Sequence, residues 1–186
     1  GNVITGGVRR RLRITGSRGI GFATADAFLR EGAKVAVAAS SEKNAEAAVE
    51  KLKAIHPDAE VVGISPNLGS FESVKEEFDK VEKQFGRIDI LVNNAGVSES
   101  TPFTSYTEAD FDRVIDLNVK GVFNATRAVV DGMIKNHSGV VLNTSSMVSI
   151  SGQPSGFAYP ASKFAVNGTT ISLARELGPK GIRVNA

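Results

Sequence analysis

The chain has 186 residues, of which 41% are hydrophobic and 23% charged, a balance that is ordinary for a globular domain and excludes a disordered or collagen-like chain. Its 22 basic and 20 acidic residues leave a net charge of +2, which is too small to indicate a nucleic-acid partner. Cysteine is absent, which excludes disulfides and a thiolate nucleophile, and no apolar run approaches the roughly 20 residues of a membrane helix.

The N-terminal segment matches no clear element. It has no charged head followed by a long apolar block, so no secretory signal is predicted and we expect a cytoplasmic protein. Residues 3–7 look like a second copy of a strand with the start of a loop. An arginine cluster follows, which could bind phosphate or form a solvated arm: Arg9, Arg10, Arg11, Arg13 and Arg18. We treat residues 1–11 as an irregular arm of a single domain that spans residues 1–186.

Short apolar runs then alternate with helical patterns. Strands are predicted at residues 12–14, 35–39, 61–64, 88–92 and 139–142, and another begins at 183. Helices are predicted after residue 21 and at 42–55, 71–85, 107–135 and 158–177. Ser70 is suited to cap the third helix, Gly86 to end it, and Thr107 with Asp110 to cap the fourth.

The predicted strands are continuous apolar runs, and such runs are typical of a parallel sheet that helices cover on both faces. The fold class is therefore α/β, with a doubly wound parallel sheet in three layers. Ligands of such sheets bind at the carboxyl ends of the strands. Arg13 conflicts with this prediction, because the first strand is central and a buried arginine is costly.

Residues 15–21 contain the densest glycine cluster, with Gly16, Gly19 and Gly21 in the spacing G-x-x-x-G-x-G. Glycines let the backbone turn tightly, and the helix that follows directs its free N–H groups at an anion. A pyrophosphate is the expected ligand of this loop. Glycine-rich turns are common, so the loop alone is a weak indication of a phosphate site. The helix and the strand that follow it make the indication stronger.

The end of the second strand bears on the choice of dinucleotide. An acidic residue there would bind the ribose hydroxyls of NAD, but the strand runs into Ser40 and Ser41, with Glu42 only after them. Arg18 and Ser40 could instead bind a 2′-phosphate, which favours NADP over NAD. The alternative is that Arg18 is a solvated loop residue and Ser40 a helix cap.

Tyr159 and Lys163 are four residues apart, so on a helix they share one face. Free tyrosine titrates near pH 10, too high for acid–base work near neutrality. A lysine cation at about 4 Å would favour the phenolate by roughly 4 kcal/mol at an effective dielectric of 20. Taken alone, the pair could equally be an ordinary surface pair.

Two other strands end in small polar residues. The strand at 139–142 is followed by Asn143, Thr144, Ser145 and Ser146, and the strand at 88–92 by Asn93, Asn94, Ala95 and Gly96. In a parallel sheet these ends meet at the edge that carries the glycine loop. Each segment taken singly looks like an ordinary turn.

Together these segments resemble the short-chain dehydrogenase/reductase family. The resemblance runs from about Ile14 to Ala186 and rests on the glycine loop, residues 93–96, Ser146, and Tyr159 with Lys163; Ser146 lies thirteen residues before Tyr159. It implies a Rossmann-type fold, a nicotinamide cofactor, and hydride exchange between a secondary alcohol and a ketone.

The resemblance also implies the roles of single residues. Tyr159 would be the acid/base, Ser146 would bind the carbonyl oxygen, and Lys163 would favour the phenolate and hold the nicotinamide ribose. Asn118 would support a proton-relay water near the lysine. No metal is expected. The residues that match cofactor-binding positions are Gly16, Ser17, Arg18, Gly19, Ile20, Gly21, Ser40, Asn67, Asn94, Ala95 and Gly96, together with Tyr159 and Lys163. Many members carry aspartate where Asn67 stands.

Within the family, the sequence is similar to bacterial 3-oxoacyl-acyl-carrier-protein reductases and to bile-acid hydroxysteroid dehydrogenases, the latter notably at residues 156–163. A 3-oxoacyl thioester reductase is the favoured function, and a hydroxysteroid dehydrogenase is the alternative. A cofactor-binding module without catalysis is an alternative of another class. We expect a small ketone, alcohol or acyl thioester as the substrate, and neither nucleic acid nor a membrane as a partner.

The family typically continues beyond the position of Ala186 with a segment that covers the substrate and with a last helix and strand. The fold is therefore expected to be truncated at this end. Relatives usually form tetramers through the helices around residues 107–135 and 158–177, so a homo-tetramer is expected.

Overall fold

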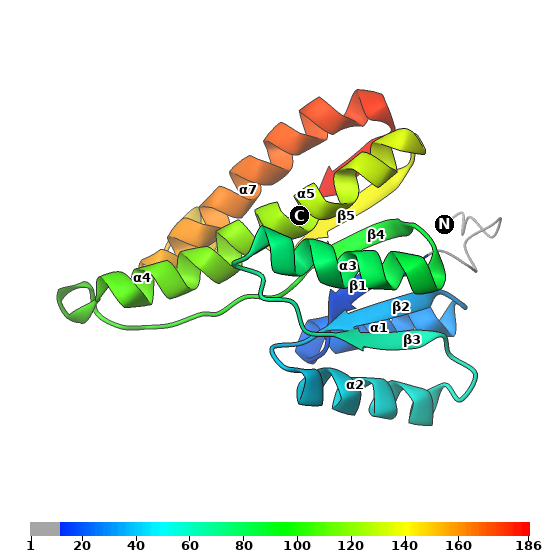
Figure 1. Cartoon of the computed structure of the whole chain (residues 1–186). Coiled ribbons are helices and arrows are strands. Elements are labelled where there is room, and N and C mark those ends of the chain that lie inside the picture. Colours follow the sequence, from blue (N-terminus) through cyan, green and yellow to red (C-terminus); the bar gives the residue numbers. More distant parts are fainter. Residues whose placement is uncertain (1–11) are drawn as a thin grey trace.

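The computed structural model describes residues 12–186, so the predicted arm at 1–11 and the strand-like repeat at 3–7 lie outside the described residues (Figure 1). The strands are β1 (Leu12–Gly16), β2 (Lys34–Ala38), β3 (Val61–Ile64), β4 (Ile88–Asn93), β5 (Gly139–Asn143) and β6 (Ile182–Asn185). The α-helices are α1 (Gly19–Arg30), α2 (Glu42–Ile55), α3 (Phe71–Phe85), α4 (Glu108–Ile115), α5 (Gly121–Lys135), α6 (Val148–Ser151) and α7 (Ala158–Leu177). Among residues 12–186, no helix is both long and apolar enough to cross a membrane.

The strands form one parallel sheet in the order β3-β2-β1-β4-β5-β6. The order reverses between β1 and β4, which makes the sheet doubly wound. Alternate residues of β2 enter separate cores: Val35 and Val37 pack with α1 and α2, whereas Ala36 belongs to the core beneath α3, α5 and α7. The predicted three-layer, Rossmann-type α/β fold is confirmed.

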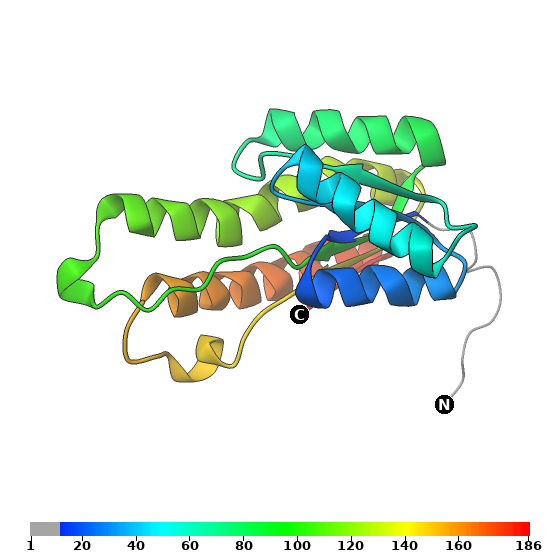
Figure 2. The same ribbon diagram turned by 90° about the horizontal axis from the view of Figure 1, so that it is seen from below.

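Helices α4 and α7 pack against each other, and both views show them extending together beyond one edge of the sheet (Figures 1 and 2). The loop from β4 to α4 and the segment that carries α6 run alongside them. Since β1, β2, β4 and β5 are parallel neighbours, these projecting elements lie at the edge where the strands end.

Several local predictions are confirmed. The helices at 42–55 and 158–177 and the strand at 61–64 have the predicted bounds. The Ser70 hydroxyl accepts the N–H of Ser73, and Thr107 with Asp110 forms a reciprocal capping box. Helix α3 ends at Gly86, whose φ of 91° lies in the region that favours glycine. These features depend on local sequence, which explains why they could be predicted.

The predicted continuous helix after Thr107 is wrong in one respect. A π-helical turn, η2 (Asp116–Lys120), separates α4 from α5. Such a turn inserts a residue into the helical repeat, and it often occurs at functional sites. Asn118 lies within it and is 1% exposed. The apolar periodicity on either side continues through the turn, so a pattern of apolar residues could not reveal it.

Arg13 is buried in central strand β1 despite the expected cost of a buried arginine, with 2% of its surface exposed. Its guanidinium carbon lies 4.7 Å from the centre of the Phe28 ring in α1. A cation over an aromatic face recovers part of the cost of burial. Strand β1 pairs in parallel with Lys34–Ala38 on one side and with Ile88–Leu91 on the other, where the register shifts between Leu12 and Arg13.

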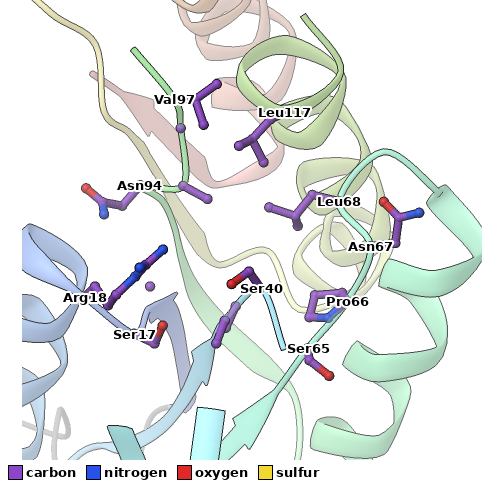
Figure 3. Close-up of a pocket in the computed structure, with 15 residues that line it drawn as sticks. Ser17, Arg18, Ser40, Ser65, Pro66, Asn67, Leu68, Asn94, Val97 and Leu117 are labelled. Atoms are coloured by element: carbon purple, nitrogen blue, oxygen red, sulfur yellow. The ribbon is translucent and has the colours of Figure 1, made fainter. Parts of the chain in front are cut away.

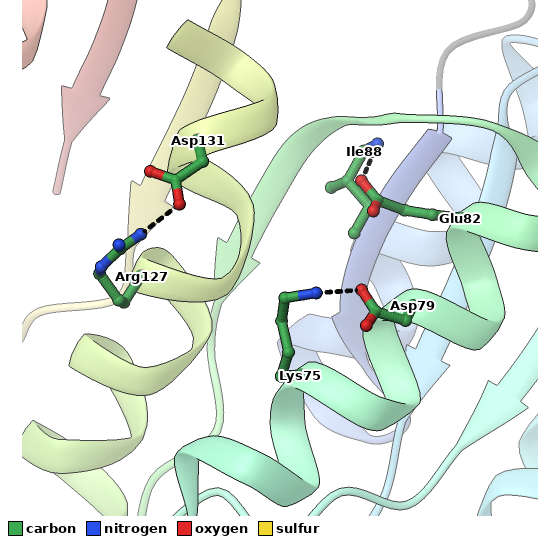
Figure 4. Close-up of polar contacts among 6 residues, drawn as sticks. All are labelled: Lys75, Asp79, Glu82, Ile88, Arg127 and Asp131. Carbon is green, nitrogen blue, oxygen red and sulfur yellow. Dashed lines mark hydrogen bonds and ion pairs between the residues drawn. The ribbon is translucent and has the colours of Figure 1, made fainter. Parts of the chain in front are cut away.

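Helices α3 and α5 pack against each other, and both carry ion pairs on their exposed faces (Figure 4). Lys75 pairs with Asp79 on α3, and Arg127 Nη1 lies 2.8 Å from Asp131 Oδ2 on α5. Exposed pairs of this kind contribute at most about 0.5 kcal/mol each. The buried apolar face of α3 therefore fixes the helix in place, and the charges keep its outer face hydrated.

The close approach of Gly16 and Gly21 gives a prediction about stability. A Cβ on Gly21 would lie 2.7 Å from Gly16 Cα, so Gly21→Ala must displace α1 from the end of β1. We expect a loss of about 2 kcal/mol in the free energy of unfolding, within the range of overpacked sites. The measurement is urea denaturation.

The matched control is Gly132→Ala in α5, where the new Cβ would meet only Glu82 Oε1 at 3.9 Å. Alanine should stabilise this helix position by about 0.5–1 kcal/mol. Equal free energies for the two variants would show that the contact between Gly16 and Gly21 does not constrain the loop.

Candidate active site

A cavity of about 600 Å³ opens at the edge where the strands end (Figure 3). The glycine turn after β1, the residues after β2 and β3, and the loop after β4 all line it. Its predicted cofactor-binding residues are Gly16, Ser17, Arg18, Ser40, Asn67, Asn94, Ala95 and Gly96. The fold thus gathers segments that are far apart in the sequence around one space.

The glycine turn forms a tight cradle. The backbones of Gly16 and Gly21 almost touch, and the Thr15 hydroxyl donates to the Gly21 carbonyl at 3.2 Å. Helix α1 begins at Gly19 and has no acidic residue in its first turn, so its positive end stays uncompensated. A turn that glycines hold this close to the start of a helix, with the helix N-terminus uncompensated, fits a pyrophosphate.

The other predicted site residues lie apart from the cavity lining: Gly19, Ile20 and Gly21 of the glycine turn, and Asn118, Ser146, Tyr159 and Lys163. Gly19 lines a neighbouring pocket of about 470 Å³ together with Ser17 and Arg18. Gly21 is buried beneath the turn, and the Ile20 side chain is 67% exposed. Gly19, Ile20 and Gly21 belong to the first turn of α1, so they shape the cradle or lie at its rim.

Arg18 and Ser40 face the same end of the cavity. Arg18 is exposed, and Figure 3 shows its side chain extending toward the cavity, with Ser40 nearby. The Ser40 hydroxyl accepts a hydrogen bond from Asn44 Nδ2 at 3.2 Å, so its own proton remains available to donate. Among the residues that the structure describes, none that lines the cavity carries a carboxylate. This end of the cavity therefore suits an anionic group.

Sequence reasoning missed several apolar and small residues of the lining: Ala38, Ala39, Ser65, Pro66, Leu68, Val97 and Leu117. Asn124 on α5 holds the loop after β3 in place, since its Nδ2 donates to the Leu68 carbonyl at 2.7 Å. The rule that ligands bind at strand ends could have indicated residues 65–68. Leu117 had no such signal because it lies in the unpredicted π-helical turn.

Lys163 connects α7 to the cavity. It is 5% exposed, and its Nζ donates to the Thr144 carbonyl at 2.8 Å. The same atom lies 5.6 Å from the centre of the Tyr159 ring and 3.7 Å from the position of a Cβ on Gly96. Burial lowers the pKa of Lys163, because an ammonium ion loses hydration there. The predicted juxtaposition of the tyrosine and the lysine on one helix face is present.

Asn118 holds the loop after β4 against α7. Its Oδ1 accepts the Val97 N–H and its Nδ2 donates to the Val97 carbonyl, both at 2.8 Å. The same nitrogen donates to Ser162 Oγ at 3.0 Å, and Ser162 Oγ donates to the Tyr159 carbonyl at 2.6 Å. The Asn118 amide therefore satisfies both main-chain groups of Val97, as a paired strand would. Asn118 belongs to the π-helical turn, and its side chain is directed into the protein.

Ser146 lies in the turn between β5 and α6, and α6 packs against α7. Its hydroxyl accepts the Val148 N–H at 3.4 Å, which leaves the hydroxyl proton free. Two residues before it, the Thr144 hydroxyl donates to Asn94 Oδ1 at 3.1 Å. The segment 143–146 thus contacts the cavity lining at one end and α7 at the other.

The other tyrosine of the chain is unsuited to proton transfer. Burial and a 2.7 Å hydrogen bond to Glu99 raise the pKa of Tyr106 to about 12. Its ring also packs on Phe157, with 5.0 Å between the ring centres. No group of three His, Asp or Glu side chains that could hold a metal is found within residues 12–186.

Comparison with known proteins agrees with this geometry. The family model for short chain dehydrogenase matches residues 12–186. The chain belongs to the short-chain dehydrogenase/reductase family. Its members are oxidoreductases that act on CH–OH groups with a nicotinamide cofactor, so this chain is an oxidoreductase of that class.

Individual relatives of this short-chain dehydrogenase/reductase are similar over most of the chain. A 3alpha-hydroxysteroid dehydrogenase of Mediterraneibacter gnavus is 52% identical over 171 residues, 92% of this chain and 68% of the relative. The 3-oxoacyl-acyl-carrier-protein reductase FabG of Staphylococcus epidermidis is 42% identical over 175 residues, 93% of this chain and 71% of that protein. The crystal structure of an NAD+-bound xylitol dehydrogenase superposes with a TM-score of 0.90 at 33% identity, covering 96% of this chain and 69% of that one.

The buried lysine gives a pH prediction. Because its pKa is lowered in the folded state, folding releases this proton, and stability rises with pH as the pH increases toward the unfolded value of 10.5. Lys163→Met lacks the titrating group. The difference in melting temperature, wild type minus variant, should therefore increase with pH over that window. A difference that stays constant would contradict a buried, titrating lysine.

Proposed function

We propose that this chain exchanges hydride between NADP(H) and an apolar ketone or secondary alcohol, with Tyr159 as the acid/base. The observation that carries the proposal is the position of Lys163 Nζ, within 5.6 Å of the Tyr159 ring centre and beside Gly96 of the cavity. This places the tyrosine helix next to the space suited to a dinucleotide.

Each proposed residue has one task. When bound, the nicotinamide ring supplies or accepts the hydride. Tyr159 donates its phenolic proton to the carbonyl oxygen during reduction and takes it back during oxidation. Ser146 keeps its hydroxyl proton and donates a hydrogen bond to the same oxygen. General acid–base groups in this kind of arrangement typically accelerate a reaction by about 10² to 10⁴.

Lys163 and Asn118 support this chemistry. The ammonium group of Lys163 favours the phenolate of Tyr159 and binds the nicotinamide ribose. Asn118 is a positioning residue: it holds residue 97 and, through Ser162, the main chain at Tyr159. We also retain the proposal that Asn118 supports a relay water near Lys163.

The cofactor preference follows from charge. The pyrophosphate is bound by the glycine turn, with Gly16, Ser17, Gly19, Ile20 and Gly21. Residues 94–96 face the nicotinamide end of the cofactor. Arg18 and Ser40 bind the 2′-phosphate of NADP(H), and the absence of a carboxylate from the cavity lining supports this preference. Asn67 lies near the adenine ring.

The substrate proposal has two candidates. The 52% identical relative favours a 3-hydroxysteroid or its ketone, and the 42% identical relatives favour a 3-oxoacyl thioester. Next to Ser146, the side chains of Met147 and Ile150 are 86% and 85% exposed. An apolar wall of this kind suits either a flat ring system or an acyl chain. A panel of 3-oxosteroids and 3-oxoacyl thioesters separates the two.

We also propose a homo-tetramer in the cytoplasm. Phe123 on α5 and Phe164 and Ile171 on α7 are 58%, 51% and 63% exposed, and large exposed apolar side chains on neighbouring helices support association. Sedimentation velocity measures the size of the assembly.

Tyr159→Phe tests the acid/base assignment. Removal of the phenolic hydroxyl should lower kcat by at least about 100-fold across the ketone panel, because only the proton donor is lost. The dissociation constant for NADPH should stay within about twofold. Tyr106→Phe is the matched control and should keep wild-type kcat, since its hydroxyl is bound to Glu99. Near-normal turnover of Tyr159→Phe, or tight NADPH binding by a wild type that turns over no ketone, would refute the proposal.

Arg18→Ala tests the phosphate site. Loss of a charge-assisted hydrogen bond should weaken NADPH binding about 10- to 100-fold and leave NADH binding within about twofold. Arg30→Ala, which removes an exposed arginine at the far end of α1, is the control and should change neither. Equal losses for NADPH and NADH in Arg18→Ala would mean that the 2′-phosphate binds elsewhere.

A further inference from the structure

One asparagine on α7 joins the serine loop to the helix that carries Tyr159 and Lys163. Asn167 lies eight residues after Tyr159 and four after Lys163, so the three side chains follow one another along one helix face. No sequence motif selects it. We propose that Asn167 is a positioning residue that fixes the Ser146 hydroxyl relative to Tyr159.

The contacts of Asn167 reach residues on both sides of Ser146. Ser145 Oγ donates to Asn167 Oδ1 at 2.6 Å, and Asn167 Nδ2 donates to Ser149 Oγ at 2.8 Å. Ser149 in turn donates from its hydroxyl, at 2.6 Å, and from its N–H, at 3.0 Å, to the carbonyl of Ser146. Ser146 is therefore held by its predecessor and by its own carbonyl, and both connections lead to one amide.

The direction of these hydrogen bonds fixes the orientation of the amide. A serine hydroxyl has one proton, and Ser149 uses its proton on the Ser146 carbonyl. Ser149 Oγ can then only accept, so the amide nitrogen of Asn167 must face it. The amide oxygen faces Ser145, whose proton it accepts. Ser149 is 4% exposed, so water does not readily replace these bonds.

The hydrogen bonds of Asn167 bear on the distance between the hydroxyl groups of Ser146 and Tyr159. Ser146 lies on a short turn, whereas Tyr159 and Lys163 lie on a twenty-residue helix. A misplacement of about 1 Å can lower a rate about 100-fold. Within residues 12–186, the 3.4 Å contact with the Val148 N–H is the one hydrogen bond of the Ser146 hydroxyl itself. The position of Ser146 relative to Tyr159 thus depends on the hydrogen bonds that Asn167 makes with Ser145 and Ser149.

A double-mutant cycle separates positioning from a merely structural role. Because the inference rests on the proposed catalytic role of Ser146, the cycle combines Asn167→Leu with Ser146→Ala. Asn167→Leu should lower kcat about 10- to 100-fold and leave NADPH binding within about twofold, since the glycine loop is untouched. In the Ser146→Ala background the same substitution should change kcat less than about twofold, because the group it positions is gone.

Two further variants refine the result. Asn167→Asp keeps the acceptor for Ser145 but loses the donor to Ser149, so its kcat should lie between wild type and Asn167→Leu. It also replaces the leucine variant if that variant does not fold. Asn136→Leu removes an amide that donates to the Gly132 carbonyl at the end of α5, and it should keep wild-type kcat, because Asn136 precedes the start of β5 whereas the serine loop follows the end of that strand.

The outcomes are distinguishable. Wild-type kcat in Asn167→Leu, or losses that multiply in the double variant, would overturn the positioning role and leave the proposed function intact. Wild-type kcat in Ser146→Ala would refute the catalytic role of Ser146 and the inference together. A loss confined to KM or to NADPH binding would also overturn the inference.

Discussion

The parallel pairing of β1 with β2 and β4, and of β4 with β5, is the constraint on which the site depends. Parallel strands end at the same edge, so Gly16 lies beside Ala38 and Asn93 beside Asn143. Residues separated by more than a hundred positions thereby meet around one cavity. The reversal of strand order between β1 and β4 separates the loops at that edge and opens the space between them.

Side-chain amides and hydroxyls then fix the loops that the sheet brings together. Asn93 Nδ2 donates to Asn143 Oδ1 at 2.9 Å, and Asn143 Nδ2 donates to Thr170 Oγ1 on α7 at 2.9 Å. Asn118 forms a similar link to the loop after β4, and Asn167 to the segment after β5. Satisfied buried polar networks of this kind favour one arrangement of the backbone. The buried ammonium group of Lys163 acts against stability, and the catalytic role that we propose for it would explain why it is buried beside the cavity.

Much of this fold could be predicted because its signals are local. Capping residues, glycine stops and apolar runs marked the helix at 42–55, the strand at 61–64 and the helix at 158–177. The glycine loop and the pair Tyr159 with Lys163 have fixed spacings, so they could be selected from the chain. The π-helical turn at 116–120 could not, because it changes the helical repeat without changing the apolar pattern. The places of Leu117 in the cavity lining and of Asn167 beside the serine loop could not be predicted for a related reason, because tertiary packing determines which residues they contact. The accommodation of Arg13 over Phe28 likewise depends on how α1 packs on β1.

A crystal structure of the chain with NADP+ tests the central claim most directly. The account predicts the pyrophosphate at the Gly16–Gly21 turn, the 2′-phosphate in contact with Arg18 and Ser40, and the nicotinamide ring within reach of Tyr159 Oη and Ser146 Oγ. A cofactor bound away from the ends of β1 and β4, or a nicotinamide ring separated from both hydroxyls, would contradict it.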